Sequence, residues 1–338
     1  MVASPVTPLR PAQVGGAQAF VCDLAAGLAA RGHDVTLHCA EGSDVAGVRL
    51  VTVPAPRDAA AALVMPGGAP PPPTPGVAAA LGAMFDAISR ERPDVVSQHA
   101  FDAPAFELAA GLPVLHTLHL PPLVPAVVDA AARIEPARLA TVSRSCQSAW
   151  NAAGVVAGRV LRNGVAEVTP LGSGFELAAL IAGRMSPEKG IDHAISAARW
   201  AGLPVKVAGP HYDPAYEVDL RGAERLGALP RLALRRLMAR SAVTVCAVRW
   251  EEPFGMVAAE AQMEGCPVAA YRRGAMREVI EEGVSGFLAE ADDVDALAQA
   301  ISRCLTLDRG AVRASARRRL SLDTALDRYE QALAQAAR

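Results

Sequence analysis

Lysine is almost absent from this sequence. Lys and Arg together number 33, but only Lys189 and Lys206 are lysines. Alanine is very abundant, and this bias is typical of bacteria with GC-rich genomes. Basic residues (33) and acidic residues (35) nearly balance and are interspersed, so the net charge of −2 gives no sign of a surface built for nucleic acids or other polyanions.

Paired cysteines and long apolar runs are also missing. The six cysteines are scattered without any Cys-x-x-Cys spacing, which argues against a zinc or iron–sulfur site and favours free thiols in a reducing cytoplasm. Residues 1–20 do not read as a signal peptide, and no stretch reaches the roughly 18 apolar residues of a membrane helix. We therefore expect a soluble cytoplasmic protein without a transmembrane segment, while a peripheral membrane contact stays open.

Several common enzyme motifs are absent as well. The sequence contains no Gly-x-Ser-x-Gly and no Walker phosphate loop. It also lacks Gly-x-Gly-x-x-Gly, which weakens the interpretation as a nicotinamide-dependent enzyme.

What the sequence does contain is an alternation of short apolar runs and amphipathic helical stretches. This alternation predicts an α/β fold with βαβ units around parallel sheets, and 338 residues suffice for two domains. Turn signals over 163–176 break the pattern, so we expect domains at 1–165 and 166–320 and a terminal helix at 321–338 that crosses back to the first domain. Ligands bind beyond the carboxyl ends of parallel strands, so the motifs should face a cleft between the domains.

The individual elements follow from the same pattern. A stiff Pro-rich loop is expected at 66–76. Strands are expected at 35–38, 48–53, 94–97, 113–117, 139–142, 178–183, 204–208, 243–247, 267–270 and 286–288. Helices are expected at 16–31, 77–90, 124–134, from about 189, and at 213–220, 230–240, 255–264, 293–305 and 322–336.

The strongest motif lies in the second half, where Glu252 and Glu260 are separated by seven residues. Pro253 and Gly255 mark a tight loop after a strand, and Gly255 opens the next helix. Free N–H groups and the helix dipole at such a start favour an anionic ligand, and a diphosphate fits. Glu260, about a turn and a half into the helix, can accept hydrogen bonds from sugar hydroxyls. The alternative is a surface loop with solvated acids, which the Pro-Phe-Gly inside the spacing disfavours.

A basic motif spans 182–190, which also follows a strand and opens a helix. Arg184 and Lys189 in this motif can clamp a leaving diphosphate. The alternative is a basic turn that faces solvent. One of only two lysines falls here, which favours the functional interpretation, whereas Lys206 is expected to point to solvent from a strand.

The run from Glu252 to Glu260 resembles the Glu-x7-Glu signature of retaining glycosyltransferases of the GT-B fold, family 4. The other motifs occur in family order over nearly the whole chain. The resemblance implies two Rossmann-like domains, with Glu252 near the donor sugar and its phosphates and Glu260 on the nucleotide ribose. The backbone amides around Phe254, Gly255 and Met256 would meet the donor, and the family carries a matching Arg and Lys at the diphosphate.

Two motifs of the first domain match the same family. Gly15 and Gly16 correspond to a Gly-Gly loop beside the phosphates and the acceptor, although a plain turn would look the same. His119 corresponds to a histidine near the reacting anomeric carbon, because it lies beyond the end of its strand. His116 is expected to point inward in the sheet, and His99 is a weaker candidate for the site. A packed or exposed histidine is the alternative at each position.

The start of the chain departs from the family pattern. Family members usually have a full strand before the Gly-Gly loop, and here only Val2–Val6 is available. Pro5 lies within it, and proline is poorly tolerated in a central strand. Either this strand is short or the true start lies upstream.

An Asp-x-Asp pair at Asp293 and Asp295 could in principle bind a metal ion. It immediately precedes a helix, however, where acids satisfy free N–H groups and the dipole. We therefore expect a helix cap, no metal site and no cofactor, with the nucleotide diphosphate sugar as co-substrate.

The expected function is the metal-independent transfer of a hexosyl unit, with retained configuration, to a hydroxyl of a small molecule, glycan or lipid. Among family members UDP-glucose and UDP-N-acetylglucosamine are the commonest donors, while GDP-mannose and dTDP-deoxysugars stay open. One alternative is a GT-B nucleotide-sugar epimerase, which the Glu-x7-Glu run disfavours. The other is a catalytically idle protein that binds a nucleotide sugar, which the truncated first strand keeps open.

Overall fold

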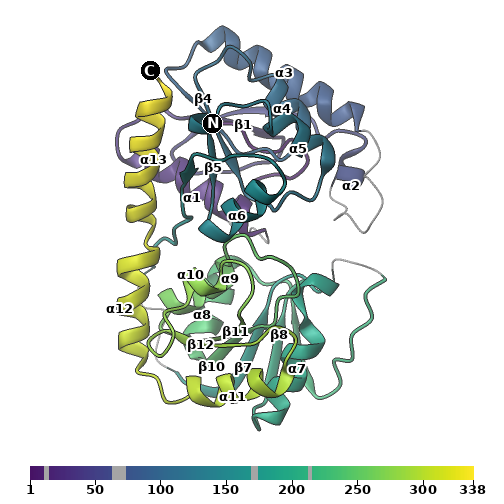
Figure 1. Ribbon diagram of the computed structural model, residues 1–338, viewed down its shortest axis with the longest axis vertical. Helices are drawn as coiled ribbons and strands as arrows, with labels where there is room; N and C mark the ends of the chain where they lie inside the picture. Colours follow the sequence, from purple (N-terminus) through teal and green to yellow (C-terminus); the bar gives the residue numbers. More distant parts are fainter. Residues whose placement is uncertain (11–14, 63–73, 169–173, 212–214) are drawn as a thin grey trace. The chain divides into compact units, whose positions relative to one another are not determined.

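The chain forms two compact α/β units (Figure 1). The computed structural model describes residues 1–10, 15–62, 74–168, 174–211 and 215–338. The first unit comprises Met1–Pro11, Ala17–Arg162 and Ala325–Arg338, and the second comprises Ala12–Gly16 and Asn163–Thr324. Most of the Pro-rich loop expected at 66–76 lies outside the described residues.

The sheet of the first unit consists of parallel strands in two groups. In one group β1 pairs with β2, and in the other the order is β3-β4-β5-β6. Val2 joins the groups, because it forms parallel bridges to His38 of β1 and to Gln98 of β3. The strands are β1 (Thr36–Ala40), β2 (Arg49–Val53), β3 (Val96–Gln98), β4 (Val114–Leu118), β5 (Leu139–Thr141) and β6 (Arg159–Val160).

The expected first strand at Val2–Val6 is reduced to this single bridging residue. The N–H group of Val2 donates to the carbonyl of Ser97 at 2.9 Å, and that of Ala3 donates to the carbonyl of His38 at 3.0 Å. Pro5 already lies in a turn. Because proline has no N–H to donate to a neighbouring strand, pairing on both sides ends before it.

Helices surround this sheet, and the last helix of the chain is among them. Tyr329 of α13 lies 5.6 Å from Phe20 of α1, measured between ring centroids, so the C-terminal helix packs on the first unit. The start of α6 is marked by Ser143, whose hydroxyl accepts from the N–H of Cys146 at 2.9 Å. The helices are α1 (Gly16–Ala30), α2 (Ala59–Ala62), α3 (Pro75–Glu91), α4 (Ala103–Glu107), α5 (Pro125–Ala131), α6 (Arg144–Ala152) and α13 (Leu322–Ala336), with a 3₁₀ turn at Pro136–Arg138.

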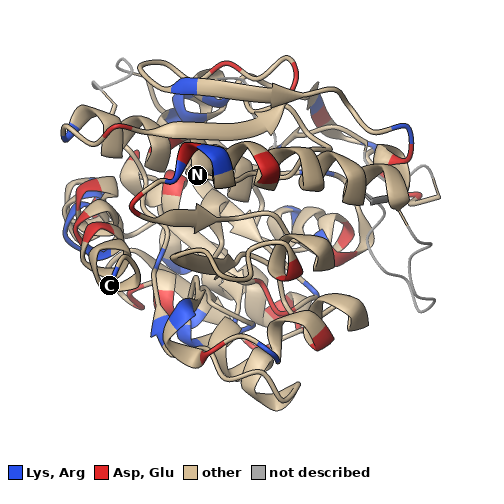
Figure 2. Ribbon diagram, turned by 90° about the horizontal axis from the view of Figure 1, so that it is seen from above, with Lys and Arg blue, Asp and Glu red and all other residues tan. Residues whose placement is uncertain are grey.

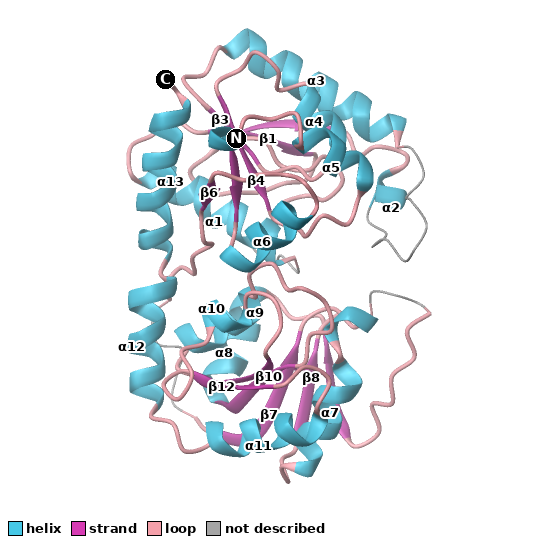
Figure 3. Cartoon of the chain, viewed as in Figure 1, coloured by secondary structure: helices cyan, strands magenta, loops and turns pink. Residues whose placement is uncertain are grey.

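The second unit contains one parallel sheet with the strand order β12-β11-β10-β7-β8-β9 (Figure 3). Both sheets are thus parallel, as the alternating pattern predicts. The strands are β7 (Glu176–Ala182), β8 (Val205–Ala208), β9 (Ala223–Gly227), β10 (Ser241–Cys246), β11 (Val268–Tyr271) and β12 (Gly286–Ala289). The helices are α7 (Ile191–Trp200), α8 (Arg231–Arg240), α9 (Met256–Met263), α10 (Met276–Val279), α11 (Val294–Cys304) and α12 (Arg309–Leu320), with a 3₁₀ turn at Pro187–Lys189.

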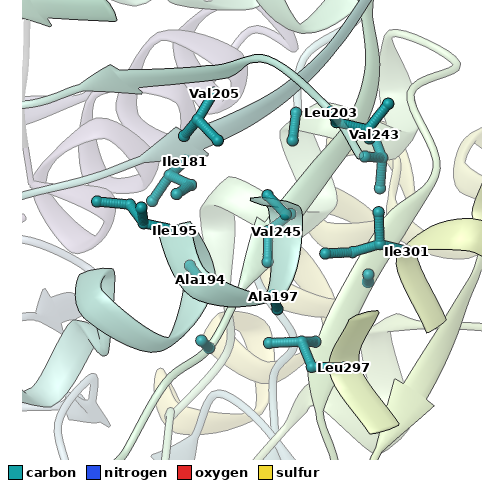
Figure 4. Close-up of a cluster of buried hydrophobic side chains, with 14 of the residues drawn as sticks. Ile181, Ala194, Ile195, Ala197, Leu203, Val205, Val243, Val245, Leu297 and Ile301 are labelled. Carbon is teal, nitrogen blue, oxygen red and sulfur yellow. The ribbon is translucent and has the colours of Figure 1, made fainter. Parts of the chain in front are cut away.

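A continuous apolar core fixes this second sheet. Ile181, Val205 and Val245 of the central strands meet Ile195 of α7 and Leu297 of α11 (Figure 4). Strands buried on both faces read as uninterrupted apolar runs, which is why β7 and β10 were recognisable in the sequence. The core therefore holds the loops that follow these strands in place.

The predicted helix at 213–220 is wrong. Residues 213 and 214 lie outside the described part, and residues 215–220 are not helical. The next element is instead β9, an edge strand that exposes Glu224 and has no apolar pattern by which it could be predicted.

Helix α12 was also missed, because its many arginines mask the buried stripe formed by Val312, Ala316 and Leu320.

Acidic and basic residues are interspersed along the ribbon (Figure 2). Lys206 of β8 does not point freely to solvent as expected: its side chain is 18% exposed and forms ion pairs with Glu176 and Glu224.

Among the described residues, no helix has the length and hydropathy needed to cross a bilayer.

Two glycines give opposite predictions for stability. A Cβ at Gly286 would clash with the carbonyl group of Val268 in the neighbouring strand, whereas nothing lies within 4 Å of a Cβ at Gly82 in α3. Gly286→Ala should therefore lower the free energy of unfolding by at least about 1–3 kcal/mol, and Gly82→Ala should raise it by about 0.5–1 kcal/mol. Urea unfolding of the two variants beside the parent chain measures both changes. Equal effects of the two substitutions would contradict this packing.

Candidate active site

Helix α9 is the first helix after β10 and follows a loop at the carboxyl end of the second sheet. Gly255 is its N-cap, with φ of 92°, and none of the described residues caps the helix with a side chain. This positive φ favours glycine, because a side chain at this position would strain the backbone. Phe254 and Met256 beside it are 3% and 7% exposed. The first N–H groups of α9 are thus free of side-chain caps, as an anion site requires.

Glu252, three residues before this helix, is held by two donors. Its Oε2 accepts from Lys189 Nζ at 2.7 Å and from Trp250 Nε1 at 2.8 Å. The Lys189 ammonium also lies 5.0 Å from the centroid of the Trp250 ring, in cation–π geometry. Glu252 is 9% exposed, so the ion pair compensates the burial of its charge.

Arg184 lies in the same loop as Lys189, between β7 and α7. Its Nε donates to Glu188 Oε1 at 2.8 Å, and the Ser186 hydroxyl donates to the same oxygen at 2.6 Å. Burial alone would raise the pKa of Glu188, but these two hydrogen bonds outweigh it and lower the pKa below its ordinary value. The N–H of Arg249 donates to the carbonyl of Glu188 at 2.8 Å, which ties this loop to the loop after β10.

Glu260 lies in α9, where its Oε1 accepts from Arg231 Nε of α8 at 2.6 Å. The two side chains are 7% and 15% exposed. Each glutamate of the Glu-x7-Glu run is therefore paired with a cation, Glu252 with Lys189 and Glu260 with Arg231.

The histidine candidates lie in the first unit, beyond neighbouring strands. His119 Nε2 and His99 Nδ1 are 2.9 Å apart, and His99 Nε2 is 2.8 Å from the Ser97 hydroxyl. Burial lowers the pKa of His119 to about 4 and that of His99 well below its ordinary value. Both rings are thus neutral at neutral pH, so His119 can act there through hydrogen bonding and not as a cationic acid.

The remaining predicted residues have these positions. Gly16 is the first residue of α1, and Gly15 immediately precedes it. Asp293 is the N-cap of α11, and its Oδ1 accepts from the N–H of Ala296 at 2.8 Å, which confirms the interpretation as a cap. In the described ranges, no group of three or more His, Cys, Asp or Glu side chains is arranged to hold a metal ion.

Family models match both units. The model for glycosyl transferases group 1 matches residues 176–321, and the model for glycosyltransferase family 4 matches residues 14–166. A D-inositol 3-phosphate glycosyltransferase of Mycobacterium marinum is 36% identical over 143 residues. That match covers 38% of this chain and 30% of the relative's length.

Solved structures agree with the whole architecture. A crystal structure of AviGT4, a glycosyltransferase involved in avilamycin A biosynthesis, matches with a TM-score of 0.74 at 22% identity and covers 99% of this chain and 97% of its own. The Anabaena protein Alr3699/HepE in complex with UDP-glucose also gives a TM-score of 0.74, at 19% identity, and covers 99% and 98% of the two chains.

The fold and the sequence matches define one class of protein. Two parallel-sheet α/β domains with these structural neighbours constitute the GT-B fold. The chain belongs to the family 4 type of GT-B glycosyltransferases. The family resemblance of the sequence and the expected fold class are therefore confirmed.

Some contacts around the candidate residues were not expected from the sequence. Trp250 and Arg231 each bind one glutamate of the motif, and Glu188 braces Arg184. Trp250 stands only two residues before Glu252, so its position could have drawn attention to it. Arg231 comes from a helix 29 residues earlier in the chain than Glu260, and no local pattern links the two.

His116 provides a pH-dependent test of the first unit. It is fully buried in β4, its ring stacks on Phe106 at 4.9 Å between centroids, and both ring nitrogens have no partner in the described structure. Burial, and secondarily Arg138, lowers its pKa to about 4 from 6.5. The unfolded state therefore binds a proton as the pH falls below 6.5, and the folded state does not bind one until about pH 4.

We expect His116→Phe to flatten the loss of stability between about pH 6.5 and pH 4, by up to about 3 kcal/mol. It should also stabilise the protein at pH 7, because two buried polar atoms without partners are removed. Urea unfolding of both proteins across this pH range gives the two stability curves. Parallel curves would show that the buried ring is not a source of the acid sensitivity.

Proposed function

We propose that this protein moves a hexosyl unit from a nucleoside diphosphate sugar to an acceptor hydroxyl, with retention of the anomeric configuration. The observation that carries the proposal is the cluster of Lys189, Trp250 and Glu252 beside the uncapped start of α9. It combines a cation, free backbone N–H groups and a carboxylate at the carboxyl end of a parallel sheet. These are the groups that an anionic leaving group and a sugar with hydroxyl donors need.

In the proposed reaction the nucleoside diphosphate leaves, and the acceptor hydroxyl attacks from the same face of the sugar. Arg184, Lys189 and the N-terminus of α9 stabilise the negative charge that develops on the leaving phosphate. An oxygen of that phosphate takes the proton of the acceptor hydroxyl. We assign neither glutamate as a covalent nucleophile, and the two cations supply the positive charge without a metal ion.

The remaining site residues have supporting roles in this proposal. Glu252 binds hydroxyls of the donor sugar, and Glu260 binds the ribose. The backbone amides around Phe254, Gly255 and Met256 meet the diphosphate. The Gly15–Gly16 pair, just before α1, allows the backbone to approach the ligand. In the first unit, neutral His119 acts as a hydrogen-bond partner near the anomeric carbon.

UDP-glucose is the first donor to test, since the Anabaena protein was solved with it. UDP-N-acetylglucosamine, GDP-mannose and dTDP-deoxysugars follow. The name of the Mycobacterium marinum relative adds an inositol phosphate to the acceptor panel, beside small molecules, glycans and lipids. None of the six cysteines, all of which lie in the described ranges, forms a disulfide bond, which supports a reducing, cytoplasmic setting.

One assay separates this proposal from its alternatives. The protein is incubated with each nucleotide sugar, with and without acceptors, and the sugar products are identified by chromatography and NMR. A glycoside with retained configuration supports transfer. A new sugar isomer formed without an acceptor indicates an epimerase, and binding with neither product indicates an idle binding protein; each of these outcomes contradicts the proposal.

The two lysines provide a matched pair of variants. Lys189→Ala should reduce the transfer rate by roughly 10²–10³, because the developing phosphate charge loses a donor. Glu252→Ala should reduce it by a comparable factor while the protein stays folded. Lys206 lies on β8, outside the Lys189–Trp250–Glu252 cluster. Lys206→Ala breaks its ion pairs with Glu176 and Glu224 and should leave the transfer rate nearly unchanged.

Initial rates and circular dichroism of the purified variants give activity and folding together. A near-normal rate in folded Lys189→Ala or Glu252→Ala protein would refute their assigned roles. An equal loss in Lys206→Ala protein would show that the effect is general.

Tryptophan offers a second matched pair. Trp250→Phe keeps a ring beneath Lys189 but removes the Nε1 donor to Glu252, so we expect the rate to fall by about tenfold. Trp200, which is 62% exposed at the end of α7, serves as the control, and Trp200→Phe should have no effect on the rate. If Trp250→Phe and Trp200→Phe both keep the parent transfer rate at saturating donor, the hydrogen bond from Trp250 to Glu252 has no role in the reaction.

A further inference from the structure

Helices α8 and α9 are joined by two ion pairs at matching spacing. Arg231 pairs with Glu260 at 2.6 Å, and Arg235 pairs with Glu264 at 2.5 Å. In each helix the two partners are four residues apart, so they occupy one face. We call these the outer pair (Arg231–Glu260) and the inner pair (Arg235–Glu264).

The inner pair is part of the packing between helices. Its side chains are 3% and 1% exposed. Arg235 also donates to the carbonyl of Ala166 at 2.7 Å, and Glu264 has a second cation in Arg313 of α12, at 3.4 Å. This pair therefore ties α8 to α9 and to neighbouring segments.

The outer pair is arranged differently. Arg231 is the first residue of α8, where a positive charge is unfavourable to the helix dipole. Its side chain is 15% exposed, and the contact described for the Glu260 carboxylate is made through Oε1. A carboxylate has acceptor sites on both oxygens, so one hydrogen bond to Oε1 does not exhaust the capacity of Glu260 to accept from a hydroxyl group.

We propose that Arg231 is a positioning residue that holds Glu260 for the hydroxyl groups of the nucleoside. This inference rests on the proposed function, in which Glu260 binds the ribose. A hydrogen bond from a guanidinium restricts the rotamers of a carboxylate, so that less ordering is needed when the ligand binds. Arg231 thus acts on the sugar of the nucleoside through Glu260 and not on the phosphates.

The test is a double-mutant cycle with two ligands. UDP binding is measured by calorimetry and uridine binding by NMR titration, for the parent chain, Arg231→Gln, Glu260→Gln and the double variant. Arg231→Gln should weaken both ligands by the same factor, about tenfold, because a charge-assisted hydrogen bond to Glu260 is lost. The double variant should bind no more weakly than Glu260→Gln alone.

The inner pair supplies the control. Arg235→Lys keeps the buried charge but not the guanidinium geometry, so it should lower the melting temperature and change uridine affinity by less than about twofold. In transfer assays Arg231→Gln should raise the donor KM and leave kcat within about twofold, which a general loss of structure would not do.

Several results would overturn the inference. Unchanged affinities for UDP and uridine in Arg231→Gln would show that Arg231 does not position Glu260. Weaker binding of UDP but not of uridine would make Arg231 a phosphate ligand. Additive losses in the double variant would show that Arg231 and Glu260 act independently, and an equal loss in Arg235→Lys would show an effect of packing alone. If UDP does not bind, the same titrations are made with GDP and guanosine and with dTDP and thymidine in place of UDP and uridine. Absence of binding by all three diphosphates would overturn the proposed function and the inference together.

Discussion

Two nearly buried carboxylates are paired with two cations at the carboxyl end of the second sheet, and the rest of the candidate site depends on this pairing. A carboxylate removed from water is costly unless a positive charge and hydrogen bonds replace its hydration. Lys189 and Trp250 do this for Glu252, and Arg231 does it for Glu260. The core beneath β7 and β10 fixes the loops that carry these groups, so the charges are ordered before any ligand binds.

Because of this pairing, a bound donor has to compete with the carboxylates for the two cations of the β7–α7 loop. In the structure Lys189 is neutralised by Glu252 and Arg184 by Glu188, so an arriving diphosphate competes with carboxylates for its cations. The uncapped start of α9 does not have this competition, because its first turn contains no acidic residue. In the proposed reaction, the helix start and the released cations together favour the more strongly charged leaving group over the intact donor, which is the condition for lowering a barrier.

In the second unit the sequence predicted the buried strands better than the exposed elements, for physical reasons. Strands buried on both faces, such as β7 and β10, leave apolar runs, whereas the edge strand β9 is half exposed and the segment before it was misread as a helix. Residues on the loops after strands could be named, because loop motifs are local. The partner of Glu260 could not be named, because Arg231 reaches it only through helix packing. The pairing of His99 with His119 likewise depends on strand order, which no local pattern contains.

The most direct test of the central claim uses the scarcity of lysine. Because the chain has only two lysines, protein labelled with ¹⁵N-lysine gives two side-chain signals, which a Lys206→Arg variant assigns. UDP, GDP and dTDP are then titrated in turn. The account predicts that at least one diphosphate shifts the Lys189 signal, as its ammonium leaves Glu252 for phosphate, and that the Lys206 signal stays in place. If none of the three moves the Lys189 signal, or if only the Lys206 signal responds, the account is contradicted.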